Sequence, residues 1–291
     1  METMTVHPPG GAAAESCPLT PLQQEMLFQT LRAPESGVNV EQLVCTLREA
    51  VDPERLEAAW LRVVQRHEVL RARFLWEDVA EPVRETVGDV AVRIARHDLR
   101  ASTPEERRAA LRAWLEADRA RGFDLARAPA MRLALFGMDD GEHVLVWSFH
   151  HLLLDGRSVT HVLREVFALY DGGPEAEAGL PQRRPFREHV AWLRGRDPAA
   201  DEAYWTEVFR GAAAREPVRP CRAAPRDPAA EPASGERELR LTPEATAALR
   251  AFAAEQGVWL STLAQGAGAL LLGRYTRAGE AVFGVVRGGR A

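Results

Sequence analysis

Two adjacent histidines, followed by an acidic residue and a glycine, are the residues of this sequence best suited to chemistry. His150 and His151 end an apolar run that begins at His143, and Asp155 and Gly156 follow after Leu152–Leu154. Imidazole gains and loses protons near neutral pH, which suits a general acid or base, and a nearby carboxylate is typical of triad-like sites. The pattern therefore predicts a proton-transfer site at the end of this run.

Two imidazoles and a carboxylate also fit a zinc site. Adjacent residues on a strand point to opposite faces and rarely reach one ion, and the sequence has neither a helical HExxH nor a Cys pair. The pattern therefore favours a site without metal. The same geometry favours one working histidine: if His151 faces a cavity, His150 faces the core as a structural residue.

The flanking sequence predicts the elements that position this site. Residues 144–149 are β-rich and apolar on both faces, which is typical of an interior strand. Asp155-Gly156 supplies a turn. Apolar residues then recur at helical spacing over Arg157 to Tyr170. The predicted order is strand, histidine pair, turn and helix.

Composition limits the possible classes of protein. The chain has 291 residues, of which 46% are hydrophobic, so it can bury the core of one large domain or two. Its net charge of -5 comes from interspersed charges, which predicts neither nucleic acid nor membrane as partner. Cys17, Cys45 and Cys221 lie far apart in the sequence and form no CxxC pair. No apolar run is long enough to span a membrane, and the first residues do not have the pattern of a signal peptide. We expect a cytoplasmic protein.

Capping and periodicity predict the remaining elements. Helices are expected to start at the Thr-Pro or Asp-Pro pairs Thr20-Pro21, Asp52-Pro53, Thr103-Pro104 and Thr242-Pro243, with further helices over Phe186–Leu193 and Leu260–Leu272. Strands are expected over Leu43–Leu47, Val83–Val87, Val90–Ile94 and Arg237–Leu241, and a hairpin over Met131–Met138 and His143–Phe149. Arg215–Gly235, which has few large apolar residues, is expected to be a surface connection or disordered.

Several stretches resemble motifs of one family. His150, His151, Asp155 and Gly156 match the HHxxxDG motif of condensation domains, the acyltransferases of nonribosomal peptide synthesis that share the fold of chloramphenicol acetyltransferase. Residues 66–74, RHEVLRARF, resemble the family's RHExLRTxF, and residues 282–290, VFGVVRGGR, resemble VFGxxVSGR. Residues 19–31, LTPLQQEMLFQTL, resemble its first motif. The departures from these motifs include Arg157 in place of an aromatic residue and Gly288 in place of Ser.

The resemblance implies an α/β (α+β) fold: a chloramphenicol acetyltransferase-like lobe with a mixed sheet flanked by helices, plus the start of a second, similar lobe. We expect a flexible tail at 1–17, the N-terminal condensation lobe at 18–180, helices and a linker at 181–235, and the incomplete beginning of the C-terminal lobe at 236–291.

The resemblance also assigns roles. His151 is expected to be the catalytic residue, as a base or as a group that positions the amine. His150, Asp155, Gly156 and Arg290 are expected to support it. Asp155 would form a structural ion pair with Arg290, and the backbone of Gly156 would be an oxyanion donor. The motif residues Arg66, His67 and Arg71 are expected to be structural.

The implied reaction is amide formation between a carrier-bound acyl or peptidyl thioester and a carrier-bound aminoacyl acceptor, as in the biosynthesis of antibiotics and other secondary metabolites. No cofactor is expected to bind this chain, since phosphopantetheine belongs to the partner carrier proteins. Donor and acceptor carriers and an adenylation module are the expected partners. Two alternatives stay open: a non-catalytic lobe that docks a carrier protein, and an ester-forming HHxxxDG acyltransferase.

Overall fold

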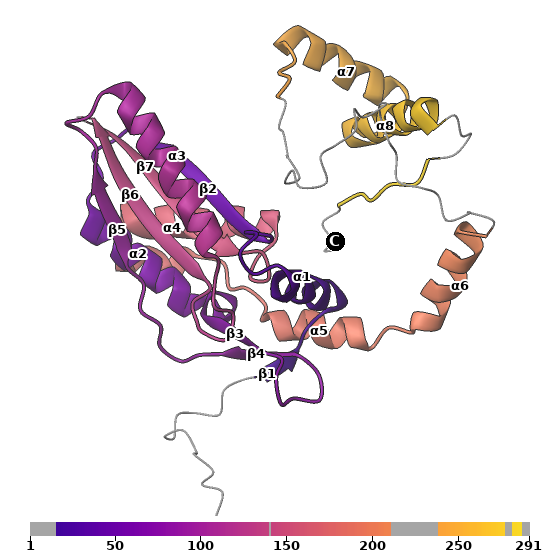
Figure 1. Ribbon diagram of the computed structural model, residues 1–291, viewed down its shortest axis with the longest axis horizontal. Coiled ribbons are helices and arrows are strands. Elements are labelled where there is room, and N and C mark those ends of the chain that lie inside the picture. Colours follow the sequence, from indigo (N-terminus) through magenta and orange to yellow (C-terminus); the bar gives the residue numbers. More distant parts are fainter. Residues whose placement is uncertain (1–15, 140, 211–237, 277–280, 287–291) are drawn as a thin grey trace, which may run out of the picture. The chain divides into compact units, whose positions relative to one another are not determined.

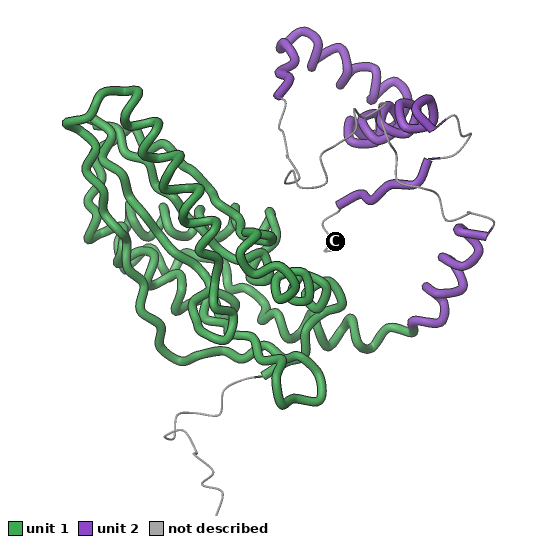
Figure 2. Tube along the Cα trace, in the orientation of Figure 1, with its two compact units in different colours: residues 1–197 green, residues 198–291 purple. Residues whose placement is uncertain are grey.

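The structure, a computed structural model, describes residues 16–139, 141–210, 238–276 and 281–286 (Figure 1). The chain divides into two compact units, residues 1–197 and 198–291 (Figure 2). Most of the predicted tail and the whole segment Arg215–Gly235 lie outside the described residues. The proposed division into a first lobe and the start of a second stays a prediction.

A four-stranded mixed sheet forms the centre of the first unit, with strand order β2-β7-β6-β5. Its strands are β2 (Val40–Leu47), β5 (Ile94–Asp98), β6 (Met131–Asp139) and β7 (Glu142–His150). β7 pairs antiparallel with both β2 and β6, while β5 runs parallel to β6. Residues 144–150 of β7 are all buried, as expected for the predicted interior strand. The β6–β7 hairpin was also predicted correctly.

Helices cover both faces of this sheet (Figure 1). The helices α2 (Pro53–Arg66) and α4 (Gly156–Gly172) pack on one face, where Trp60 of α2 meets Trp147 edge-on with ring centroids 4.8 Å apart. The helix α3 (Pro104–Arg121) packs on the other face, where Trp114 lies against Phe136. Alternate residues of β7 therefore enter two separate hydrophobic clusters, which explains why its sequence is apolar on both faces.

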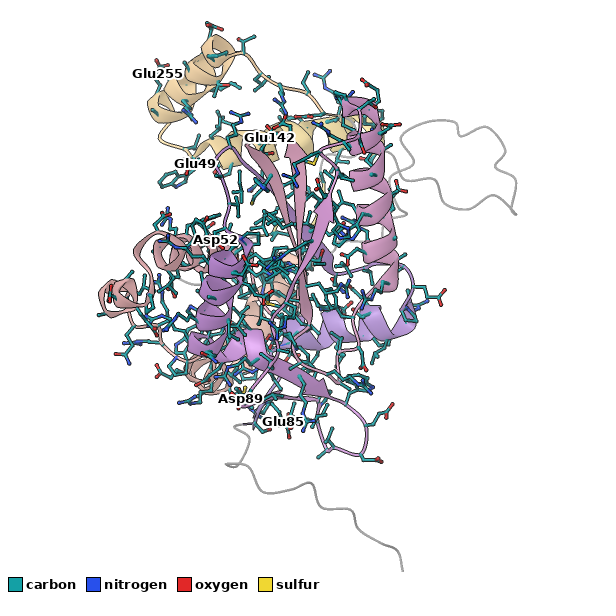
Figure 3. The ribbon with its side chains drawn as sticks, turned by 90° about the vertical axis from the view of Figure 1, so that its left-hand side faces the viewer. Glu49, Asp52, Glu85, Asp89, Glu142 and Glu255 are labelled. Atoms are coloured by element: carbon teal, nitrogen blue, oxygen red, sulfur yellow. The ribbon has the colours of Figure 1, made fainter. Side chains whose placement is uncertain are left out.

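The predicted helix starts are present. Thr20 and Gln23 form a capping box at the start of α1 (Pro21–Arg32), and Thr103 does the same with Glu106 for α3. Asp52, labelled in Figure 3, caps α2 by accepting the backbone N–H groups of the second and third helical residues. In each case a side-chain oxygen accepts backbone N–H groups that have no partner within the helix, and proline occupies the first helical turn.

The other elements are shorter or belong to the second unit. A three-stranded sheet of order β1-β4-β3 contains β1 (Ser16–Pro18), β3 (Ala72–Leu75) and β4 (Val83–Thr86). The remaining helices are the 3-10 helices η1 (Glu68–Arg71) and η2 (Pro174–Gly179), with α5 (Phe186–Arg194), α6 (Pro198–Val208), α7 (Pro243–Glu255) and α8 (Leu260–Thr276). The mixed sheet flanked by helices agrees with the predicted fold class.

Two strand predictions were wrong. The strand expected over Val90–Ile94 lies instead at Ile94–Asp98, because pairing with β6 begins only at Ile94 opposite Leu133. Val92 is buried without being part of a strand. The alternation of apolar and polar residues there therefore indicated which side chains are buried, and not where the backbone pairs with another strand. Residues 238–241, also expected to be a strand, have no regular secondary structure.

Candidate active site

The two histidines lie at the end of β7 but in different environments. His150 is the last residue of the strand and is fully buried, while His151 begins the turn and is partly exposed. Antiparallel pairing with β2 extends to this point, because the backbone N–H of His151 donates to the carbonyl of Asn39 at 2.8 Å. The two adjacent histidines therefore differ in burial.

Both ring nitrogens of His150 have hydrogen-bond partners. Its Nδ1 accepts the backbone N–H of Leu152 at 3.2 Å, which leaves Nε2 as the protonated nitrogen, and Nε2 lies 2.9 Å from Oγ1 of Thr30. The Thr30 hydroxyl in turn donates to the carbonyl of Met26. Burial, with a smaller contribution from His151, lowers the pKa of His150 from 6.5 to about 4. His150 is therefore a neutral structural residue at physiological pH.

The His151 ring is placed differently. Among the described residues, its Nδ1 is buried and has no hydrogen-bond partner. That nitrogen is closed to solvent although the residue as a whole is partly exposed. The His151 ring thus differs from that of His150, whose two nitrogens both have hydrogen-bond partners.

Asp155 and Gly156 form the start of α4. The carboxylate of Asp155 accepts the backbone N–H of Ser158 at 2.8 Å, so Asp155 is the N-cap of the helix. Gly156 is the first helical residue, and a Cβ there would meet no heavy atom within 4 Å. Its N–H belongs to the first helical turn, where backbone donors lack partners within the helix. The predicted partner of Asp155, Arg290, lies outside the described residues.

Residues from α1 and the loop before β2 hold the histidine loop, residues 150–155. The amide of Gln23 donates to the carbonyl of Leu152 at 3.0 Å. Asn39 has a left-handed backbone with φ of 60°, a conformation that asparagine adopts more readily than most residues, and its side chain donates to Met26 and Thr30. In the sequence, Gln23 and Thr30 belong to the stretch that resembles the family's first motif, but no contact with the histidine loop was predicted for them, and Asn39 was missed because it has no sequence pattern of its own.

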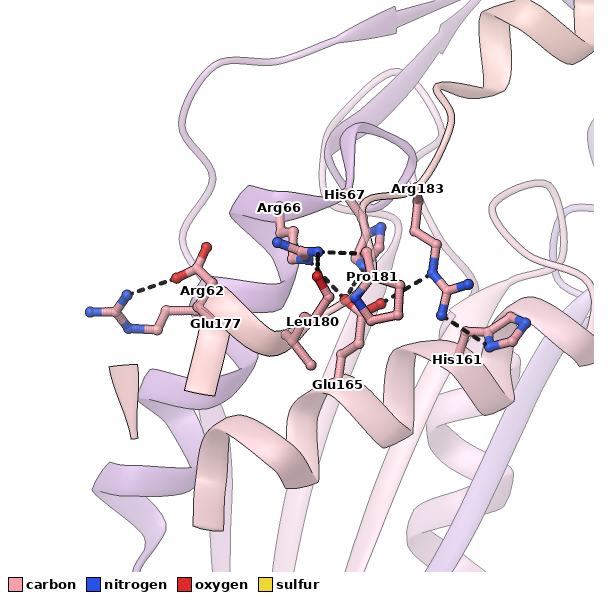
Figure 4. Close-up of polar contacts among 9 residues, drawn as sticks. All are labelled: Arg62, Arg66, His67, His161, Glu165, Glu177, Leu180, Pro181 and Arg183. Atoms are coloured by element: carbon pink, nitrogen blue, oxygen red, sulfur yellow. Dashed lines mark hydrogen bonds and ion pairs between the residues drawn. The ribbon is translucent and has the colours of Figure 1, made fainter. Parts of the chain in front are cut away.

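The motif residues Arg66 and His67 bind a buried carboxylate, Glu165 on α4 (Figure 4). The Glu165 side chain is 2% exposed, and its oxygens lie 3.1 Å from Nε of Arg66, 2.7 Å from Nε2 of His67 and 3.3 Å from Nε of Arg183. Arg66 also donates to the carbonyls of residues 180 and 181. We call Arg66, His67, Glu165 and Arg183 the Glu165 cluster.

The charges of this cluster offset the burial of its carboxylate. Burial alone raises the pKa of Glu165, but the hydrogen bond and charge of His67, with Arg183 and Arg66, together hold that pKa below its usual value. The cluster therefore ties the end of α2 to α4 and to the segment after η2. Glu165 lies beside the buried residues 162 and 166 on the apolar face of α4, and an acidic residue at such a position is the signal that could have revealed it in the sequence.

Arg71, the third motif residue, does not join the Glu165 cluster. Its guanidinium donates to the carbonyls of Val64 and Gln65 at the end of α2, and to those of Val87 and Gly88 beyond β4. One side chain thus joins a helix end to the strand region of the smaller sheet. This supports the structural role predicted for it.

Neither a metal cluster nor a membrane-spanning helix is found in the described part of the chain. No three His, Cys, Asp or Glu side chains gather there in a way that would hold a metal ion. None of the helices in those ranges has the length and apolar character needed to cross a bilayer.

Comparison with solved structures shows which kind of fold this is. The first condensation domain of the calcium-dependent antibiotic synthetase, in complex with a substrate analogue, matches with a TM-score of 0.71 and 22% identity, over 91% of this chain and 61% of that one. The starter condensation domain of the rhizomide synthetase matches with a TM-score of 0.57 and 24% identity, over 70% of this chain and 50% of that one. The fold is that of a condensation domain.

Sequence comparison identifies the family. A profile of the condensation domain matches residues 13–291, and this chain belongs to that family. One protein of the linear gramicidin synthase of Brevibacillus parabrevis is 39% identical over 274 residues, which are 94% of this chain and 4% of that protein. Bacitracin synthase 1 of Bacillus licheniformis is 32% identical over 275 residues, 94% of this chain and 5% of that protein. Condensation domains are acyltransferases that form amide bonds in nonribosomal peptide synthesis, and this is the family that the sequence predicted.

Proposed function

We propose that this chain catalyses amide formation between a carrier-bound acyl or peptidyl thioester and the amine of a carrier-bound aminoacyl thioester, with His151 receiving the amine proton. The observation that carries the assignment is the contrast between the two histidines: His150 is buried and hydrogen-bonded through both nitrogens, while His151 is partly exposed. Of the two, only His151 is able to meet a reactant.

The chemistry needs little more than a well-placed proton acceptor. An α-amino group titrates near pH ~7.7–8.0, so a useful fraction is already neutral at physiological pH. Its nitrogen attacks the thioester carbon, the C–N bond forms, and His151 accepts the proton that leaves the nitrogen. The tetrahedral intermediate then expels the thiolate, which takes up a proton as the C–S bond breaks. Holding the amine in line is a second use of the same imidazole.

Asp155, Gly156 and Arg290 are proposed to support this step. The Gly156 N–H, in the first turn of α4, would donate to the developing oxyanion, where a backbone donor at a helix N-terminus is most effective. The open space beside its Cα leaves room for a reactant. Asp155 caps α4 and, we propose, also binds Arg290, so removing its carboxylate would disturb the shape of the site more than the chemistry.

The proposed partners follow from the reaction. Donor and acceptor carrier proteins would present their substrates on phosphopantetheine arms, and an adenylation module would supply the aminoacyl group. The cofactor thus belongs to the carriers. We propose a cytoplasmic location, which the free thiols of Cys17 and Cys45 support.

The test is a condensation assay with loaded donor and acceptor carriers, with the product detected by mass spectrometry. His151→Ala is expected to lower the rate of product formation by about 100-fold or more. His161→Ala, on α4 but hydrogen-bonded to Arg183, is the matched control and should leave the rate within about twofold of the wild type. An unchanged rate for His151→Ala would contradict the assignment.

A non-catalytic docking lobe is the second candidate. The chain spans about 4–5% of the length of the synthetases that it matches and 61% of the solved condensation domain. Carrier binding without product in the same assay would favour docking. Product formed only with an alcohol acceptor would favour an ester-forming acyltransferase.

A further inference from the structure

We propose that Gln23 is a positioning residue for His151: its side chain holds the backbone of the histidine loop, so that the cap of α1 is part of the active-site frame. The inference rests on the proposed role of His151. It assigns a role in the reaction to a side chain that also completes the capping box of α1.

The Gln23 amide is buried and bonded at both ends. Its Oε1 accepts the backbone N–H of Thr20 at 3.1 Å, which completes the capping box, and its Nε2 donates to the carbonyl of Leu152 at 3.0 Å. The two partners are far apart in sequence. The Gln23 side chain therefore links the first turn of α1 to the residue that follows His151.

The anchors of the loop show why this bond matters. The backbone N–H of His151 is held by the carbonyl of Asn39, and that of Leu152 by Nδ1 of His150. Both of these contacts hold backbone N–H groups of the loop. Their acceptors lie in β7, for His150, and just before β2, for Asn39. The Leu152 carbonyl is held by Gln23, and this contact comes from a separate element. Loss of the amide donor would leave a buried carbonyl without that bond, and the loop would shift to regain one.

The experiment separates the two ends of the Gln23 amide. Gln23→Glu keeps the side-chain length and the oxygen that accepts the Thr20 N–H, since glutamate is the usual partner in a capping box, but it removes the donor to Leu152. Gln24→Glu adds the same charge at the next position of the helix, where the side chain is exposed, and serves as the control. If Gln23→Glu fails to fold, it is replaced by Gln23→Met, which is neutral and of similar length but removes both the donor to Leu152 and the acceptor of the Thr20 N–H.

Two readouts are compared in these variants. The first is the position of the His151 ring signals in spectra of histidine-labelled protein, assigned by their absence in His151→Ala. The second is a separate measurement of kcat and KM in the condensation assay, which shows which of the two the substitution changes. We expect the His151 signals to move in Gln23→Glu and not in Gln24→Glu, and kcat to fall by about 10- to 100-fold, because small displacements of a reacting group cost this much. KM should stay within about threefold.

Superimposable His151 signals in wild type and Gln23→Glu would overturn the inference, as would an equal kcat in the two charged variants. If the wild-type chain forms no product, the proposed function fails, but the ring signals still decide whether Gln23 positions His151. The two failures are thereby distinguished.

Discussion

Two polar clusters, one at the start of α4 and one further along it, are built from different chemistry. The histidine loop, with Gln23, Thr30 and Asn39, is held by neutral amide, hydroxyl and imidazole groups. The Glu165 cluster consists of a buried carboxylate with two arginines and a histidine. Both connect this part of the chain to distant parts of the sequence. The contacts made by Gln23, Thr30 and Asn39 are uncharged, whereas those within the Glu165 cluster are ionic.

The difference has a physical use. A full charge next to His151 would bias its protonation, whereas neutral donors hold the backbone without doing so. Glu165 lies nine residues after Gly156, about 14 Å along the helix axis, and the two arginines beside it offset its charge. The Glu165 cluster is thus remote from His151, the residue that we propose receives the amine proton, and the carboxylate within the loop itself, that of Asp155, caps α4. The two clusters should respond differently to substitution and to pH.

Removing the carboxylate of the Glu165 cluster should have the largest effect on stability. Glu165→Ala leaves Arg66 and Arg183 facing a buried site without their counter-charge, so the free energy of unfolding should fall by about 3–5 kcal/mol. Denaturant unfolding measures the loss. Glu177→Ala is the control, because the Arg62–Glu177 pair shown in Figure 4 has side chains 42% and 40% exposed, and its loss should cost less than about 1 kcal/mol. Equal losses of unfolding free energy in Glu165→Ala and Glu177→Ala would contradict the distinction between a buried ionic cluster and an exposed ion pair.

The pH dependence of stability should separate the two clusters. The unfolded chain protonates His150 near pH 6.5, but the folded chain, in which the pKa of this residue is about 4, does so only in stronger acid, so acid favours unfolding between these values. The difference between the two pKa values of His150 corresponds to roughly 3 kcal/mol of free energy of unfolding, and this contribution is fully lost by about pH 4. The lowered pKa of Glu165 acts in another range: its contribution is present above pH 4.5 and is lost as the pH falls below it.

Thermal unfolding at a series of pH values tests this separation. His150→Phe should flatten the profile between pH 6.5 and 4.5, while Glu165→Gln should flatten it only below pH 4.5. A wild-type profile that is flat from pH 6.5 to 4.5 would mean that His150 titrates in its ordinary range and is not held neutral by its surroundings.

A smaller effect is expected at Arg71, whose neighbours are neutral carbonyls. Arg71→Lys keeps the charge but replaces a planar group bonded to four carbonyls by a single ammonium, and should cost about 1–2 kcal/mol. Arg73→Lys, which alters a pair with Glu85 that is partly exposed, should cost less than about 1 kcal/mol and is the comparison. The free energy of unfolding of both variants, measured by urea denaturation, checks this; a larger cost for Arg73→Lys would be evidence against the role of the carbonyl contacts.

The sequence predicted those parts of the fold that depend on local chemistry. Thr20, Asp52 and Thr103, each followed by proline, start helices because they supply acceptors to backbone N–H groups a few residues away. The apolar run before His150 predicted a buried strand because alternate faces meet different helices. The strand expected at Val90–Ile94 failed because pairing with β6 depends on a partner whose register no local pattern reveals.

The candidate site was predicted only in part, because some of its contacts are local in the sequence and others join distant residues. The histidine pair with Asp155 and Gly156 is contiguous, so its motif was visible in the sequence. Gln23 binds Leu152, and Glu165 binds Arg66 and His67, across more than 90 residues of sequence, and only the folded chain brings these together. An acidic residue on the apolar face of a helix was nevertheless a visible sign of a buried ionic contact.

The most direct test of the central claim is histidine carbethoxylation of the intact chain at neutral pH, with the modified residue located by peptide fragmentation and condensation activity measured in the same samples. We expect His151 to be modified while the chain is folded, activity to be lost in proportion, and His150 to react only after unfolding. Modification of His150 before His151, or full activity in chains modified at His151, would contradict the proposed role of His151.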